Sequence, residues 1–341
     1  MDYAVRDATE TDIPAILSLM RAAMPDAAAP HTEAFWRWKH VDGPFGPSPA
    51  LLAVDDHDTP VGLRVFSRKT WFSGHEPISA VRAVDTATHP DWRRRGIFQA
   101  LTLGLVERAA AGGVSFVFNT PNDKSRPGYL KMGWQDVGQI PVRALPLRPG
   151  RAALKLAAAR AGHRLAPVPE FEDDGSVAAL LREPALDALL ANADDADARL
   201  HTVRDRAYLS WRYLNVPGYQ YLARWRFDGA EGGIVIARRR ERRGLDETTV
   251  AELISTPSAR GRSLARKALI DLCGDSPSDL LLAACAPATA ESAVLSASLF
   301  VSAPRSMGPW LTARAVGPAE PSPSPFAMSS WRAQIGDWEI F

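Results

Sequence analysis

The chain has 341 residues, 46% of them hydrophobic, and a formal net charge of +1 at pH 7. This length predicts two domains, because a single domain typically spans ~100–200 residues. The near-neutral balance is not typical of a protein that binds nucleic acid or anionic membranes. With only Cys273 and Cys285, and with no ~20-residue apolar run or signal-like start, we expect a cytoplasmic protein without a disulfide framework or a membrane partner.

Several common catalytic motifs are missing from the sequence. The seven histidines are scattered, and there is neither an HExxH motif nor a pair of cysteines at zinc-binding spacing. The GxSxG, GxGxxG and GxxxxGK[ST] patterns are also missing. The sequence therefore disfavours a metal hydrolase, a serine hydrolase of the common type and a kinase, and it predicts no metal site.

The first half of the chain alternates between strand and helix patterns. In order, it predicts a strand at 3–7, an amphipathic helix at 13–24, a helix at 35–41, an antiparallel pair at 50–56 and 61–72, and a long strand at 78–88. A helix from Ile97 to Ala111 follows and ends at Gly112 and Gly113. A buried strand is predicted at 114–119, and a loop with a short helical turn is predicted at 121–134.

The second half predicts the same order of elements. After a helix at 151–161 and a linker at 162–176 come helices near 184–192 and 208–213, a hairpin at 219–227 and 232–240, a strand at 250–256, a helix at 258–273 and a strand at 279–285. The phrase FWRWKHVDGP at 35–44 is echoed by YLSWRYLNVP at 208–217, and paired positions are 173 residues apart. The sequence thus predicts a duplicated αβ unit, in which Trp38 and Trp211 are core anchors. The expected boundaries are 1–147, a connector at 148–165, and 166–341.

The most informative stretch is THPDWRRRGIFQAL, residues 88–101. A strand stops, a tight turn with Gly96 follows, and a helix begins at once. Such a turn exposes unpaired backbone N–H groups at the positive end of a helix, which suits a pyrophosphate. Judged by spacing alone, a basic solvated turn explains these residues equally well.

A set of motifs in order extends this stretch. Residues Arg93 to Ile97 fit the first five places of the pattern [Q/R]-x-x-G-x-[G/A], and Phe98 departs from the small residue usual at the sixth. Polar residues follow the next strand, and then comes a Tyr-x-x-x-Gly-aromatic element: Asn119, Asn122, Ser125, and YLKMGW with Tyr129, Gly133 and Trp134. From residue 3 to about 142, the chain resembles the GNAT superfamily of acyl-CoA N-acyltransferases, in particular a large tandem subgroup.

The resemblance implies two tandem GNAT-like units, each a mixed, mostly antiparallel sheet flanked by helices. It also implies transfer of an acyl group from acetyl-CoA or another acyl-CoA to an amine of a small molecule or peptide. By this resemblance, the cofactor-binding residues are Thr86, Thr88, Arg93, Arg94, Arg95, Gly96, Ile97, Phe98, Asn122 and Ser125. Tyr129 is implied as the acid that protonates the departing thiolate, with packing of its loop as its alternative role.

The general base stays open between Asp85, His89 and a water chain. Alternation along the strand places Asp85 on the face opposite Thr86 and Thr88. His89 ends the strand and has a suitable pKa for the task, although His89-Pro90 also resembles a simple strand-ending turn. Trp36 or His40 is a further candidate for the acceptor pocket, in the first copy only.

The second copy departs from the pattern. SARGRSLA at 258–265 displaces the needed glycine, and Leu295 and Leu299 take the tyrosine and glycine places. We therefore expect this half to support the fold and shape the acceptor site. The arginine run at 238–243 is interpreted as a solvated turn. Two alternatives to acetyl transfer remain: a longer acyl-CoA or acyl-carrier-protein donor, and a non-catalytic ligand-binding or scaffold protein.

Overall fold

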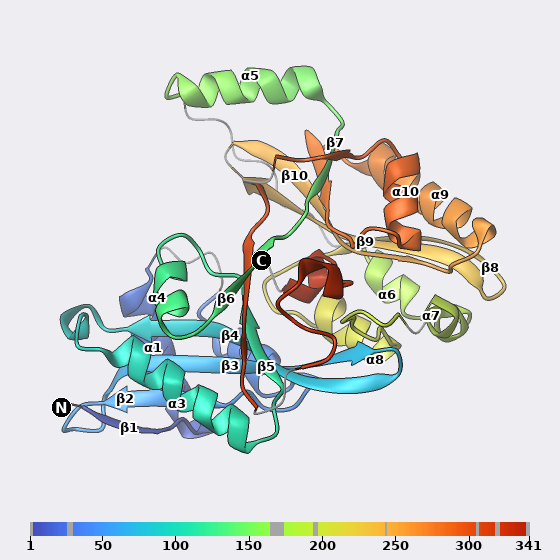
Figure 1. Ribbon diagram of the computed structural model, residues 1–341. Coiled ribbons are helices and arrows are strands. Elements are labelled where there is room, and N and C mark those ends of the chain that lie inside the picture. Colours follow the sequence, from blue (N-terminus) through green and yellow to red (C-terminus); the bar gives the residue numbers. More distant parts are fainter. Residues whose placement is uncertain are drawn as a thin grey trace.

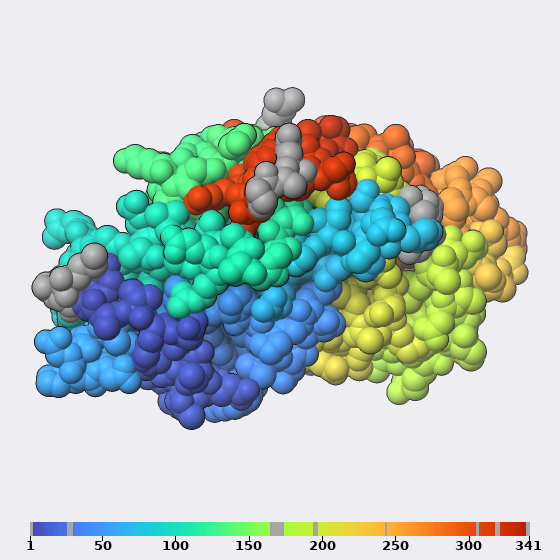
Figure 2. Space-filling view, turned by 60° about the horizontal axis from the view of Figure 1, so that its bottom comes forward, coloured from blue at the N-terminus to red at the C-terminus, as the bar shows by residue number. Residues whose placement is uncertain are grey.

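The described residues of this computed structural model are 3–25, 30–163, 174–193, 197–242, 244–304, 307–317 and 321–338. They form two mixed β-sheets, each flanked by helices (Figure 1). Figure 2 shows the two units in contact, where the end of the first unit drawn in light blue meets the second unit in yellow and green. The expectation of two α/β units with mostly antiparallel sheets is confirmed.

The first sheet has the strand order β1-β2-β3-β4-β5-β13-β6. Its strands are β1 (Ala4–Asp7), β2 (Ala50–Val54), β3 (Pro60–Ser73), β4 (Glu76–Thr88), β5 (Phe116–Asn119), β6 (Gln135–Gln139) and β13 (Trp310–Ala315). Its helices are α1 (Ile13–Ala23), α2 (Glu33–His40), α3 (Ile97–Ala111) and α4 (Arg126–Lys131), with 3-10 turns at η1 (Glu10–Asp12) and η2 (Pro90–Trp92). Leu52 and Val54 pack in the core with α1 and α2, while Leu51 and Ala53 pack with α3, so the helices cover both faces.

The second sheet has the order β12-β7-β11-β10-β9-β8. Its strands are β7 (Arg143–Pro146), β8 (Leu222–Asp228), β9 (Glu231–Arg242), β10 (Leu245–Ser255), β11 (Leu280–Ala283) and β12 (Val301–Ser302). Its helices are α6 (Ser176–Leu180), α7 (Leu186–Ala193), α8 (Arg206–Leu209), α9 (Ala259–Asp275) and α10 (Ala290–Ala297), with a π-helical turn η3 (Ser210–Leu214). Helix α5 (Pro149–Arg160) follows β7 and packs on the second unit, where Arg151 and Lys155 pair with Asp279. The 3-10 turns η5 (Met328–Ser330) and η6 (Ile335–Trp338) end the described chain.

The two units exchange one strand each. β7 lies between β11 and β12 of the second sheet, and β13 lies between β5 and β6 of the first. In Figure 1 the green β7 runs up into the second unit while the red segment that leads to β13 runs down into the first. The boundary expected at residue 147 therefore does not separate the two sheets, because each sheet is completed by a strand from the other half of the chain.

The two echoed phrases meet at the contact between the units. The indole rings of Trp38 and Trp211 stack with centroids 5.0 Å apart. Each indole donates a hydrogen bond to the other's backbone oxygen, at 2.7 Å from Trp38 and 2.9 Å from Trp211. Such a reciprocal contact is what a two-fold relation between two similar surfaces produces. The repeated phrase therefore builds the interface between the units. Trp38 is buried in a core formed mostly by the second unit, as expected for a core anchor, whereas Trp211 is only partly buried against the same core.

The C-terminal segment, residues 321–338, packs between the two units. Trp331 and Trp338 lie in one core with Trp71 of β3 and with Phe116 and Phe118 of β5. Arg204, which precedes α8, joins Asp337 at 2.8 Å and also pairs with Glu252 of β10. These buried contacts tie the C-terminal segment to both sheets at once.

Candidate active site

The turn before α3 leaves the start of this helix open. Arg94 and Gly96 adopt left-handed backbone angles, with φ of 65° and 78°. Gly96 is the N-cap of α3, and no described side chain caps the helix there. A Cβ atom at Gly96 would meet no described atom within 4 Å. Free N–H groups at the positive end of a helix therefore face open space, as an anion site requires.

A cavity of about 560 Å³, here called the donor cavity, opens at this turn. It is lined by the end of β4, the turn before α3, the end of α1, and the loop between β5 and α4: Ala23, Met24, Thr86, Ala87, Thr88, Trp92, Arg93, Arg94, Gly96, Ile97, Phe98, Gln99, Lys124, Ser125 and Gly128. Its volume is in the range of small-molecule and cofactor sites. Arg93, Arg94 and Lys124 give its lining positive charge.

Strand β4 parts from β5 beside the donor cavity. The two strands pair only from Ala80 to Arg82, although β4 continues to Thr88. A β-bulge also lies at Asp85, because Arg64 of β3 faces Thr86 while the next residue, Val65, faces Val84. The last residues of β4 therefore present a strand edge, unpaired with β5, to a ligand in the donor cavity.

Eight of the ten residues predicted to bind the cofactor line the donor cavity. The two that do not are Arg95 and Asn122. The Arg95 guanidinium lies 4.6 Å from the centre of the Trp92 ring. The Asn122 side chain accepts hydrogen bonds from the backbone N–H groups of Lys124 and Ser125, at 3.1 and 2.9 Å, and so shapes the loop between β5 and α4. Sequence reasoning missed the contribution of α1 to the cavity, since only the fold brings its end beside α3.

Tyr129 is buried behind the donor cavity, against Phe98. The two rings meet edge to face with centroids 5.6 Å apart. The phenol oxygen accepts a hydrogen bond of 2.5 Å from the guanidinium of Arg64, which also donates to the backbone oxygen of Val84 at 2.8 Å. Because a guanidinium only donates, the proton of the phenol is not used in this contact. Arg64, which is fully buried, is a residue that the sequence analysis did not single out.

Asp85 is held by two basic side chains of α2. Its carboxylate lies 2.8 Å from the Lys39 ammonium and 2.6 Å from Nε2 of His40. Burial alone would raise the pKa of Asp85, but these two neighbours outweigh it and hold the pKa well below its usual range. A carboxylate with so low a pKa is a weak base. The geometry instead shows Asp85 fastening the bulge of β4 to α2.

His89 occupies the turn after β4, outside the lining of the donor cavity. Its ring nitrogen accepts a hydrogen bond of 3.4 Å from the backbone N–H of Asp91, and so caps the 3-10 turn η2. The side chain is 38% exposed. The two residues considered for the acceptor pocket are Trp36 and His40. Trp36 is buried in the core with α1, and His40 is buried beside Asp85.

The matching turn of the second unit is closed. The Ser258 side chain caps α9 by accepting from the backbone N–H of Gly261 at 2.9 Å. The hydroxyl of Ser258 in turn donates to the carboxylate of Glu231. A Cβ atom at Gly261 would lie only 1.8 Å from the Thr256 hydroxyl oxygen, so this glycine serves close packing. A capped helix end beside a carboxylate does not suit a phosphate.

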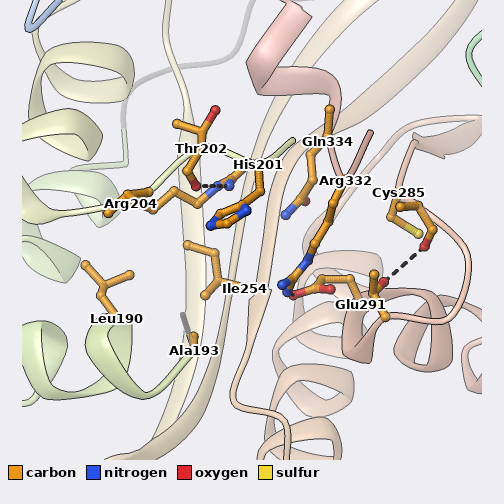
Figure 3. A pocket seen from close by; sticks show the side chains of 14 residues that line it. Leu190, Ala193, His201, Thr202, Arg204, Ile254, Cys285, Glu291, Arg332 and Gln334 are labelled. Atoms are coloured by element: carbon orange, nitrogen blue, oxygen red, sulfur yellow. Dashed lines mark hydrogen bonds and ion pairs between the residues drawn. The ribbon is translucent and has the colours of Figure 1, made fainter. Parts of the chain in front are cut away.

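The strand edge of the second unit is also filled. Gly62 of β3 packs against α3, and Gly233 of β9 packs against α9, so the two glycines hold matching places in the two units. Gly62 pairs with Thr88 of β4, and Gly233 pairs with Ser255 of β10. Two residues before these partners, Leu253 of β10 is therefore the counterpart of Thr86 of β4. The Gln334 side chain accepts from the Leu253 N–H at 2.7 Å and donates to its carbonyl oxygen at 2.9 Å. In Figure 3 Gln334 and its neighbours from the C-terminal segment reach into a pocket of about 50 Å³ beside β10.

Another cavity, of about 610 Å³ and here called the inter-unit cavity, lies between the units. The loop between β5 and α4 separates the two large cavities: residues 120–123 line the inter-unit cavity, and Lys124, Ser125 and Gly128 line the donor cavity. Among the described residues, no group of three histidine, cysteine or acidic side chains is arranged to hold a metal. Within the same residues, no helix is long and apolar enough to cross a bilayer.

Comparison with known protein families gives a match to the first unit. Residues 4–137, which make up the first unit as far as β6, match the family described as the Acetyltransferase (GNAT) domain. The first unit therefore carries a GNAT acetyltransferase domain, and this domain supports an acyltransferase activity. A search of curated proteins finds no match to the sequence.

Solved structures share the fold over both units. A GCN5-related N-acetyltransferase from Anabaena variabilis ATCC 29413 is similar with a TM-score of 0.61 and 12% identity, over 92% of this chain and 73% of that one. One from Kribbella flavida has a TM-score of 0.58 and 16% identity, over 91% and 70%. Eis1 from Mycobacterium abscessus has a TM-score of 0.53 and 13% identity, over 92% and 73%. At these identities the similarity shows a common fold.

Proposed function

We propose that the protein is an N-acetyltransferase that transfers the acetyl group of acetyl-CoA to an amine of a small molecule or peptide. The open N-terminus of α3 in the first unit carries this proposal, because it combines free N–H groups, adjacent arginines and a cavity of about 560 Å³. A pyrophosphate needs such a combination of backbone donors and positive charge. The glycine at position 96 supports the fit, since any side chain there would stand in the open space of the cavity.

The residues of the donor cavity have distinct proposed roles. The backbone from Arg94 to Phe98 binds the pyrophosphate, and Arg93 and Arg94 add charge beside it. The backbone edge of β4 at Thr86 and Thr88 pairs with the amide groups of the pantetheine arm, because β5 leaves this edge free. Together these contacts direct the thioester toward the gap between β4 and β5.

Tyr129 is proposed as the proton donor. In the reaction the amine nitrogen forms a bond to the thioester carbon, the carbon–sulfur bond breaks, and the leaving sulfur needs a proton. Arg64 holds the phenol oxygen of Tyr129 at 2.5 Å and leaves its proton available for this transfer. Arg64 is thus a positioning residue. The amine also loses a proton, and the candidates for the base that accepts it are Asp85, His89 and water. The low pKa of Asp85 disfavours Asp85 in this role.

The second unit is proposed to bind no acyl-CoA. Three observations support this proposal: the Ser258 cap on α9, the Glu231 carboxylate beside it, and the Gln334 side chain on the strand edge that corresponds to the donor edge. One donor site per chain follows. The second unit instead supplies one wall of the inter-unit cavity.

The test combines binding with turnover. Calorimetry with acetyl-CoA measures donor binding to the full chain, and release of free thiol with a panel of amines measures transfer. We expect micromolar-range binding and amine-dependent thiol release. Binding without thiol release for any amine would support the non-catalytic alternative, and weaker binding of acetyl-CoA than of longer acyl-CoA would favour the alternative donor. No binding of any acyl-CoA would contradict the proposal.

A further inference from the structure

The inter-unit cavity lies where an acceptor needs to be. Strands β4 and β5 are parallel, so their carboxyl ends lie at the same edge of the first sheet. The donor cavity follows the end of β4, and residues Thr120 to Asp123 at the end of β5 line the inter-unit cavity. Its volume of about 610 Å³ suits a small molecule or the end of a peptide.

The second unit gives this cavity a basic wall. Alternate residues of β9 share one face of the sheet, so Arg238, Arg240 and Arg242 project to the same side. Arg240 and Arg242 line the cavity. The interpretation of the run 238–243 as a solvated turn is therefore wrong for these residues, because they lie in a strand of twelve residues and Arg240 is four-fifths buried. Arg243 lies outside the described residues.

The charges on this wall are incompletely balanced. Arg240 lies 3.5 Å from the carboxylate of Glu247, whereas no carboxylate pairs with Arg242 in the part of the chain that the structure describes. Burial lowers the pKa of Arg240; Glu247 opposes this effect, and the charges of Arg242 and Arg238 add to it. An anion placed between Arg240 and Arg242 would relieve this repulsion.

The first unit contributes an acidic residue to this cavity. Asp123, from the loop between β5 and α4, is the one acidic residue that lines the cavity within the described part of the chain. It lies next to Lys124 and Ser125, which line the donor cavity. Apolar side chains, including Trp310 and Trp338, make up much of the remaining lining. A ligand with an amine at one end and an anion at the other complements this polarity.

We propose that the acceptor is an amine that carries a carboxylate or phosphate, bound with its anion on Arg240 and Arg242 and its amine toward Asp123. This inference rests on the proposed function, because the amine must reach the thioester in the neighbouring donor cavity. The basic wall selects the substrate class: it favours anionic amines and disfavours polyamines, whose additional positive charges it repels.

Matched amine pairs test the inference. The pairs are β-alanine with β-alaninamide and O-phosphoethanolamine with ethanolamine, and each pair differs mainly in the anion. We expect the anionic member of at least one pair to bind the full chain about tenfold more tightly in calorimetry and to show the higher kcat/KM with acetyl-CoA. The two pairs also distinguish a carboxylate from a phosphate.

Two variants that each remove one positive charge show whether the preference for the anion depends on Arg242. Arg242→Gln should reduce the preference for the anion about tenfold while acetyl-CoA binding stays unchanged. Arg226→Gln, on the neighbouring β8 and 54% exposed, should leave the preference intact. Asp123→Asn should weaken both members of a pair.

The outcomes separate the two proposals. Four results would overturn the anionic-acceptor inference. The members of every pair could bind equally well, the neutral members could bind more tightly, or no member could bind at all. The fourth such result is a preference for the anion that survives Arg242→Gln. If the preferred acceptors prove to be neutral amines that are turned over, the acyltransferase proposal stands and this inference fails. If anionic amines bind through Arg242 and no acyl group is transferred, the anion site stands and the proposed function fails.

Discussion

Replacing Gly96 with aspartate tests the donor site with little disturbance of the fold. At φ 78° the new side chain costs about 1 kcal/mol of backbone strain. It meets no described atom within 4 Å, so the fold should survive. The carboxylate would stand in the space where a phosphate is expected to lie. Two unit charges 4 Å apart repel each other by ~1–4 kcal/mol at effective dielectric constants between 80 and 20.

This repulsion corresponds to a rise in the dissociation constant for acetyl-CoA of about 5- to 1000-fold. Calorimetry measures the change, and thermal unfolding reports the strain. Gly113→Asp is the matched control, because Gly113 follows the other end of α3, has φ of 73° and also meets no described atom within 4 Å. It should share the strain and keep normal affinity. Near-normal affinity in Gly96→Asp, or an equal loss in both variants, would mean that acetyl-CoA does not bind with a phosphate at Gly96.

Three further predictions follow from the geometry. Tyr129→Phe should lower kcat by ~10²–10⁴-fold with acetyl-CoA affinity little changed, whereas a purely structural tyrosine would lower thermal stability and leave kcat near normal. Titration of acetyl-CoA should give one site per chain, and two equivalent sites would contradict the closed state of the second unit. The low pKa of Asp85 contributes stability that is complete above about pH 4 and declines as the pH falls further. In urea unfolding, Asp85→Asn should therefore lower the free energy of unfolding by about 2–3 kcal/mol at pH 6 and by less in acid. A loss that does not depend on pH would argue against the ion pair with Lys39 and His40.

The sequence predicted local elements well where hydrophobic period and glycine placement determine them. The predicted helix from Ile97 to Ala111 is present with the same bounds, and the strand predicted at 78–88 forms β4. The duplicated order of elements was also accessible, because the phrase around Trp38 is repeated around Trp211. These features depend on neighbours in the sequence or on a visible repeat.

The features that were missed depend on contacts between distant segments. Strand β13 was not predicted, since a short run such as WLTARA becomes a strand only when two neighbouring strands pair with it. The same holds for Arg64, whose partner Tyr129 lies 65 residues further along the chain. The arginine run at 238–243 was wrongly interpreted as a solvated turn. Sequence alone does not show which arginines of a strand will face a cavity shared with the other unit.

Hydrogen exchange with and without acetyl-CoA tests the central claim most directly, because it locates the donor along the whole chain in one measurement. Acetyl-CoA should slow exchange of the backbone amides at residues 86–88 and 94–98, and it should leave the corresponding amides at 253–264 unchanged. Protection confined to residues 253–264, or equal protection in both units, would contradict the assignment of a single donor site to the first unit.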